Sequence, residues 1–195
     1  MGEFFGIGNI LMIVLVLAVI YIISVYNTLV AMREAVRNDA KQIDVQLDRR
    51  YKIFESLISA VKKVMDYEQT TLKDVVALRG QAQKARESGD TKSRIDAENK
   101  LSGIASNFNL VVEQYPTLKA SENVLQLQEE ISNTENKLAF AKQAYNDGIE
   151  RFNTYRISFP TNIVASIFAS SFPTFVYWQL SEDDAKSKDE YTVKF

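Results

Sequence analysis

Carboxylates and arginines are the side chains of this sequence that could do chemistry. The 195-residue chain has 25 acidic and 23 basic side chains, but no histidine and no cysteine. It therefore lacks the commonest general base, the thiol nucleophile and the preferred ligands of zinc, copper and haem iron. Four carboxylates could share a metal site between helices: Glu113, Glu129, Glu130 and Glu135. Known sites of that kind also use histidine from two helices, so we expect no catalytic residue, no metal and no cofactor.

The charge and glycine content also exclude other partners. A net charge of -2 with interspersed signs gives no field that would attract a polyanion. The sequence has no glycine-rich loop that would cradle a phosphate. We therefore expect that the chain does not bind nucleic acid.

Heptad spacing predicts the elements that position these side chains. Only seven glycines and three prolines interrupt the chain, which favours long helices. Apolar residues recur alternately every four and three positions in three seams, over 29–82, 97–115 and 124–159. The fold class is predicted to be all-α, an antiparallel up-and-down bundle of long helices. Between the first two seams, Gly89 suits a left-handed helix cap and Asp90 or Thr91 an N-cap.

Three charged residues, Arg33, Arg50 and Glu68, occupy seam positions where apolar side chains are expected. A buried charge is costly unless it is paired. Such residues either specify register or partner choice between subunits, or extend to solvent from the edge of the bundle. We expect that these three side chains extend to solvent from the edge.

A short sequence repeat occurs in both the second and the third seam. Glu98-Asn-Lys-Leu101 recurs 37 residues later as Glu135-Asn-Lys-Leu138. Two copies are too few for a solenoid. The repeat reflects either a duplicated helix or coincidence between two heptad helices.

The N-terminus predicts a membrane anchor. No side chain from Phe4 to Met32 is charged, and 7–26 supplies the roughly 20 residues that cross a hydrocarbon core of about 30 Å. No basic residue precedes this stretch and no small-residue cleavage site follows it, so we expect a retained single-pass helix. Lys and Arg flank only its C-terminal side, which predicts that the bulk of the chain is cytoplasmic.

A second uncharged stretch, 157–181, is interrupted by Pro160 and Pro173. It is too broken to span a bilayer and too apolar to face water, which predicts a membrane or oligomer interface. Candidate residues for such an interface are a small-residue pair near the N-terminus and five C-terminal aromatics: Gly2, Gly6, Phe168, Phe172, Phe175, Tyr177 and Trp178. The expected segments are the anchor 1–28, the bundle 29–159, the apolar segment 160–180 and the polar tail 181–195.

Motifs along nearly the whole chain resemble the LemA family. They include Tyr26-Asn27, Ile43-Asp-Val-Gln-Leu47 with Arg49-Arg50-Tyr51, Glu98-Asn99, Glu113-Gln-Tyr-Pro116, Thr134-Glu-Asn136, Tyr145-Asn146 and Phe159-Pro160. The resemblance implies one N-terminal membrane helix, a helical bundle, a bacterial cytoplasmic membrane location and no established catalytic activity. A relative linked to building magnetosome membranes also suggests membrane organisation.

The chain departs from the family pattern near residue 54: where the family usually has Leu-Ile-Pro-Asn-Leu, this sequence has Ile53-Phe-Glu-Ser-Leu57 and no proline. The family favours a bend near 48–52, whereas the in-phase seam favours one helix as far as residue 86.

We expect a membrane-anchored, non-enzymatic scaffold that self-associates into a homo-oligomer. The alternative is an adaptor whose membrane protein partner is an enzyme, such as a protease, that it docks.

Overall fold

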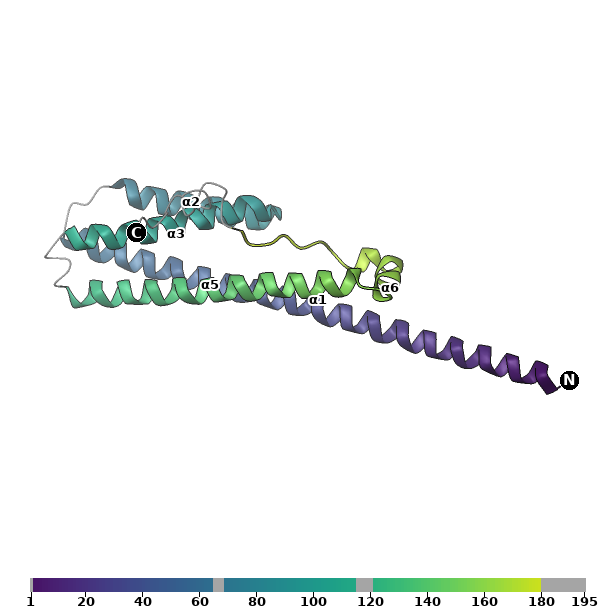
Figure 1. The fold of residues 1–195 in the computed structure, drawn as a ribbon. Coiled ribbons are helices and arrows are strands. Elements are labelled where there is room, and N and C mark those ends of the chain that lie inside the picture. Colours follow the sequence, from purple (N-terminus) through teal and green to yellow (C-terminus); the bar gives the residue numbers. More distant parts are fainter. Residues whose placement is uncertain (1, 65–68, 115–120, 180–195) are drawn as a thin grey trace, which may run out of the picture. The chain divides into compact units, whose positions relative to one another are not determined.

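The computed structural model describes residues 2–64, 69–114 and 121–179, most of which are helical (Figure 1). The elements in chain order are α1 (Gly2–Val64), α2 (Gln69–Ser88), α3 (Thr91–Gln114), α5 (Glu122–Ile157), α6 (Thr161–Ile167) and the 3-10 turn η1 (Ala169–Ser171). The described residues contain no β-strand, so the predicted all-α fold class is confirmed.

Helix α1 resolves the question of the bend, and neither expectation was fully right. The helix continues through 48–54, where proline is absent. It nevertheless ends at Val64, and α2 begins at Gln69, so no single helix reaches residue 86. In the sequence, the seam has two consecutive polar positions in this region, Glu68 and Thr71, and residues 65–68 lie outside the described part of the chain.

The chain forms two compact units, and α1 and α5 each contribute to both. Unit one contains 1–40 and 144–175, whereas unit two contains 41–143 and 176–195.

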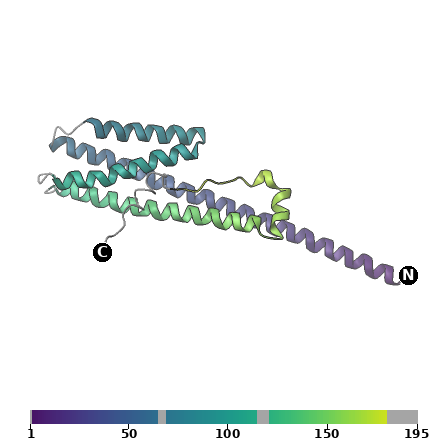
Figure 2. The same ribbon diagram turned by 45° about the horizontal axis from the view of Figure 1, so that its top comes forward.

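In unit two, successive helices run in opposite directions, as an up-and-down bundle requires (Figure 2). The predicted seams supply its core. Buried seam residues come from α1, α2, α3 and α5: Ile43, Leu47, Phe54, Leu57, Ala82, Ala97, Leu101, Val124, Ile131 and Leu138.

The connection between α2 and α3 is built from the predicted caps. Gly89 has a φ of 75° and its amide donates to the Arg86 carbonyl, while the Asp90 amide donates to the Ala85 carbonyl. These two bonds form a Schellman motif, which satisfies carbonyls at the end of α2. Asp90 then starts α3, because its carboxylate accepts from the Ser93 amide at 3.1 Å.

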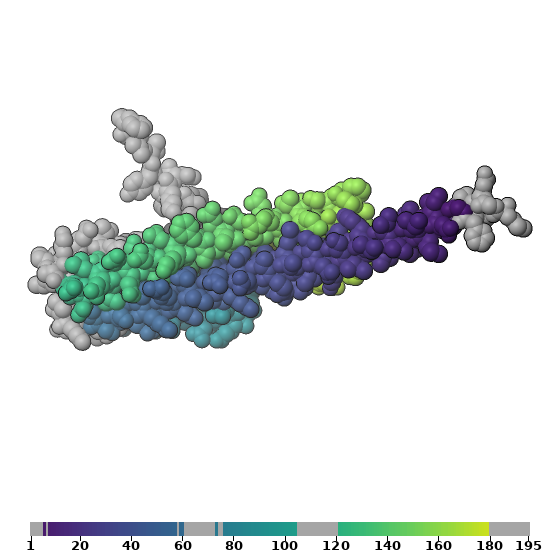
Figure 3. Space-filling view, turned by 90° about the horizontal axis from the view of Figure 1, so that it is seen from below, coloured from purple at the N-terminus to yellow at the C-terminus, as the bar shows by residue number. Residues whose placement is uncertain are grey.

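In unit one, the N-terminal part of α1 has an apolar, exposed surface. Its side chains from Ile10 to Ile20 are all exposed, and Figure 3 shows this part of the helix uncovered by neighbouring segments. By length and composition, α1 contains a stretch that is apolar enough to cross a membrane. Farther along the helix, α5 packs closely on α1. A Cβ atom at Gly148 would lie 3.1 Å from Asp39 Oδ2.

Helix α6 and turn η1 fold back against the middle of α1. The Tyr26 ring lies 5.0 Å from the Phe168 ring and 5.7 Å from the Phe172 ring, between centroids. The Phe152 ring of α5 contacts Phe172 and Phe175. Arg33 Nη1 also donates to the Ser171 carbonyl at 2.9 Å. These contacts place 168–172 beside residues 26–33 of α1, and Phe175 beside α5.

Candidate functional site

The centre of unit two contains a buried ion cluster, which we define as Arg50, Tyr51, Glu98, Ser102 and Glu135. Arg50, from α1, has an exposed fraction of zero. Its guanidinium pairs with the Glu98 carboxylate of α3 and, at 3.2 Å, with the Glu135 carboxylate of α5. It also donates to Ser102 Oγ at 2.8 Å and to the Glu98 carbonyl at 3.3 Å. One arginine therefore joins three helices.

The rest of the cluster satisfies the two carboxylates. Ser102 Oγ donates to Glu135 Oε2 at 3.1 Å. The Tyr51 hydroxyl donates to Glu98 Oε1. Burial, together with the adjacent Glu98 carboxylate, raises the pKa of Tyr51 well above its ordinary value. Tyr51 is therefore a neutral donor at physiological pH rather than a base.

This arrangement corrects the expectation for one of the three charged seam residues. Arg50 does not extend to solvent from the bundle edge, because it lies fully inside and is paired. Arg33 is different: its side chain is 20% exposed and pairs with Glu34 as well as with the Ser171 carbonyl. Glu68 lies outside the described residues.

The internal repeat maps onto the buried ion cluster. Glu98 and Glu135 are the first residues of the two Glu-Asn-Lys-Leu copies, and both pair with Arg50. The last residues of the copies, Leu101 and Leu138, are both buried. Sequence reasoning identified the repeat and the unusual arginine but missed that they contact each other.

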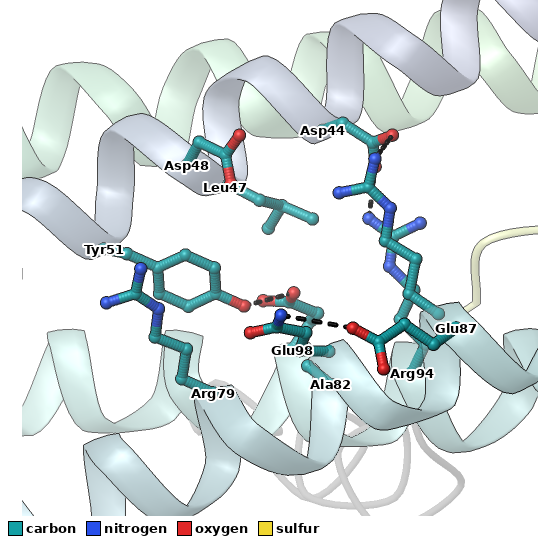
Figure 4. A pocket seen from close by; sticks show the side chains of 11 residues that line it. Asp44, Leu47, Asp48, Tyr51, Arg79, Ala82, Glu87, Arg94 and Glu98 are labelled. Carbon is teal, nitrogen blue, oxygen red and sulfur yellow. Dashed lines mark hydrogen bonds and ion pairs between the residues drawn. The ribbon is translucent and has the colours of Figure 1, made fainter.

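A cleft of roughly 530 Å³ lies beside the cluster, between α1, α2 and α3 (Figure 4). Three arginines line it, and each has a carboxylate partner. Arg86 and Arg94 pair with Asp44, and Arg79 pairs with Glu55. The Arg79 guanidinium also lies 4.9 Å from the centroid of the Tyr51 ring. Because these arginines already pair with carboxylates of the same chain, we expect them to hold the helices together rather than to bind an anion.

The end of the apolar segment, from Val176 onward, belongs to unit two, and Trp178 and Gln179 lie against its helices α3 and α5. Trp178 is buried, and its ring lies 5.7 Å from the Arg94 guanidinium and 5.1 Å from Lys142 Nζ. Asn99 Nδ2 donates to the Gln179 carbonyl at 3.0 Å. Burial, followed by the positive charge of Arg50, lowers the pKa of Lys142 to about 8, although the carboxylates of Glu135 and Glu98 oppose the shift.

A LemA family model matches residues 39–195, which include every residue of the buried ion cluster. The chain belongs to the LemA family. A protein from Metamycoplasma hominis named Protein LemA is 27% identical over 158 residues, covering 80% of this chain and 71% of that relative. The family match begins at residue 39, so it includes the cluster but not the apolar stretch of α1.

Of the four carboxylates considered for a metal site in this LemA-family chain, the three whose side chains are described do not form a group that could hold a metal ion. Glu135 pairs with Arg50, whereas the side chains of Glu129 and Glu130 are exposed. Glu113 is helical in α3, but its side chain is outside those described. Among the described residues, no group of three or more acidic side chains is arranged to hold a metal ion.

The candidate interface residues occupy different environments. Phe168, Phe172 and Phe175 contact other rings of unit one, whereas Trp178 is part of unit two and contacts Lys142 there. Tyr177 and Gly6 are exposed, and Gly2 is the first residue of α1. The chain itself therefore covers several of these aromatics, for which the sequence had indicated only lipid or a neighbouring subunit as cover.

Proposed function

We propose that this LemA-family protein is a membrane-anchored, non-enzymatic helical scaffold that self-associates. The observation that carries the proposal is α1, a single helix whose apolar, exposed N-terminal part is continuous with the arginine at the centre of the buried ion cluster. One element thus supplies both a membrane-length apolar surface and the residue that joins α1, α3 and α5.

The chemistry of the side chains supports a non-enzymatic role. The sequence lacks histidine and cysteine, and the charged residues of the buried ion cluster are occupied with each other. The cluster fixes the register of the helices, which is a role known for buried polar residues in helical assemblies.

The apolar part of α1 is the surface through which we expect copies of the chain to associate. Gly2 and Gly6 are spaced as a small-xxx-small pair, which lets membrane helices approach closely. An ideal Cβ atom at Gly6 would meet no atom within 4 Å apart from the adjacent residues and backbone of its own helix. A larger residue there would therefore obstruct a neighbouring chain without disturbing its own.

The test is the mass of the full chain in several mild detergents, measured by light scattering. The intact protein should be a homo-oligomer, and Gly6→Leu should reduce its mass. Gly8→Leu is the matched control, since Gly8 also has open space but lies about 200° around the helix from Gly6. A monomeric intact protein would refute self-association and favour the adaptor role. An unchanged mass for Gly6→Leu would refute the proposed contact.

A further inference from the structure

The corner where α5 meets α6 has an outer surface of large apolar side chains. We define the corner by four residues, and the exposed fractions are 69% for Ile157, 81% for Phe159, 54% for Ile163 and 66% for Ile167. The inner face of α6 is covered instead, because Thr161, Val164 and Ala165 are buried. No charged residue occurs from Ile157 to Gln179. An exposed apolar surface of this kind is unfavourable in water and is typical of a site that contacts a membrane or another protein.

The position of the corner along α1 indicates which environment surrounds its apolar side chains. Contacts of Phe168 and Phe172 with Tyr26, and of Ser171 with Arg33, fix the segment that follows α6 against α1. Tyr26 follows the exposed apolar run that ends at Ile23 by three residues, or about 5 Å of helix. If α1 spans a bilayer, Tyr26 lies at the interfacial level where aromatic side chains concentrate. The α6–η1 segment then meets the same interface.

The charges that flank this level match a lipid headgroup layer. After the apolar stretch, the first charged residue of α1 is Arg33. Going backward from the corner, the first charged residue of α5 is Arg156, which borders a groove of roughly 340 Å³ with Asn162 and Ser166. Guanidinium groups just outside an apolar zone are placed to meet lipid phosphates.

We propose that the α5–α6 corner is a second membrane contact, in which Ile157, Phe159, Ile163 and Ile167 enter the headgroup–acyl boundary of the bilayer that α1 crosses. The inference rests on the membrane anchor of the proposed function but goes beyond it, since it assigns the corner to lipid rather than to another protein chain. Helical surfaces of this kind lie about 5–10 Å deep in the interface and do not span it.

Single-cysteine variants allow a direct test because the natural chain contains no cysteine. The full chain is reconstituted in vesicles of phosphatidylcholine and phosphatidylglycerol, with an environment-sensitive fluorophore on Ile163→Cys. Leu15→Cys reports the anchor, and Ala144→Cys is the control. Ala144 is an exposed α5 residue of the same unit, about 20 Å before Ile157 along the helix. Quenching is measured with lipids that carry bromine at defined depths.

We expect shallow bromines to quench the label at position 163 at least about twofold more than the label at 144. Deep bromines should quench the label at 15. If position 15 is quenched but 163 behaves like 144, the corner inference is wrong and the anchor stands. If position 15 is not quenched, the anchor itself is wrong. If the label at 163 is shielded from lipid and becomes exposed on dilution of protein in lipid, a second copy covers the corner, which also overturns the inference.

Discussion

The guanidinium group of Arg50 has no solvent exposure, so the stability of the fold depends on the carboxylates that pair with it. Removing one member of a buried ion pair leaves the other charge uncompensated, which costs about 3–5 kcal/mol. Arg50→Met should therefore lower the free energy of unfolding by about that amount, measured by thermal melting of the helical circular dichroism signal in detergent.

Arg79→Met is the matched control for this prediction. Arg79 also pairs with a glutamate and contacts Tyr51, but its side chain is 44% exposed. Exposed pairs contribute less than about 1 kcal/mol. Equal destabilisation by the two variants would show that the buried ion cluster is not the centre of stability. Replacing Arg50 and Glu98 together with apolar residues should cost less than replacing Arg50 alone.

Lys142 gives the fold a pH dependence in alkaline solution. Its pKa is lowered to about 8 in the folded chain, against an ordinary value of 10.5. Between these values the unfolded chain binds more protons, so the contribution of Lys142 to the free energy of unfolding rises with pH. Tyr51 acts in the opposite sense above pH about 10, because its pKa is raised in the fold and the unfolded phenol ionises first.

Lys142→Met should remove the rise in stability that we expect from pH about 8 to about 10. Tyr51→Phe should leave that rise in place, which separates the two titrations. Melting temperatures of the three proteins across this range provide the measurement. A rise that survives in Lys142→Met would assign it to another group.

At the residue scale, the sequence predicted that Arg50 is unusual but not how it is neutralised. Its seam position shows that it points into a bundle, yet heptad spacing does not identify which helices face each other. Glu98 and Glu135 are separated from Arg50 by 48 and 85 residues. Only the tertiary arrangement brings these distant carboxylates to one guanidinium.

At the scale of elements, two glycines of the α2–α3 hairpin have opposite roles. Gly80 lies inside α2 with nothing within 4 Å of an ideal Cβ, whereas Gly89 needs its φ of 75° to end that helix. Gly80→Ala should stabilise the chain by about 0.5–1 kcal/mol, because alanine loses less backbone entropy in a helix. Gly89→Ala should destabilise it by about 1 kcal/mol, because alanine disfavours a left-handed conformation.

Thermal melts of these two variants, each compared with the natural chain, test the assignment of the hairpin. Shifts of the same sign would contradict it. The hairpin was predictable because its signals are local: a glycine followed by a side chain that caps a helix.

The break between α1 and α2 was harder to predict from the sequence. The heptad positions remain in phase from Val64 to Val75, so periodicity contains no signal that the helix ends. The polar seam residues Glu68 and Thr71 were the available evidence, although isolated polar residues also occur inside continuous seams. Packing of separate antiparallel helices satisfies the same pattern as one longer helix would.

At the scale of the whole molecule, the basic residues beyond the apolar part of α1 predict that the bundle is cytoplasmic. Ser132→Cys places the only thiol on an exposed position of α5. A membrane-impermeant maleimide should label it in permeabilised cells and leave it unmodified in intact ones. Labelling of intact cells would place the bundle on the outer side and reverse the predicted orientation.

The shared arginine also couples substitutions in the two Glu-Asn-Lys-Leu segments. Glu98 and Glu135, the first residues of the two segments, have the same partner, Arg50. Replacing either glutamate by an uncharged residue therefore changes the net charge around the other glutamate. The effects of substitutions in the two segments are therefore not independent, because they act through one side chain that belongs to neither.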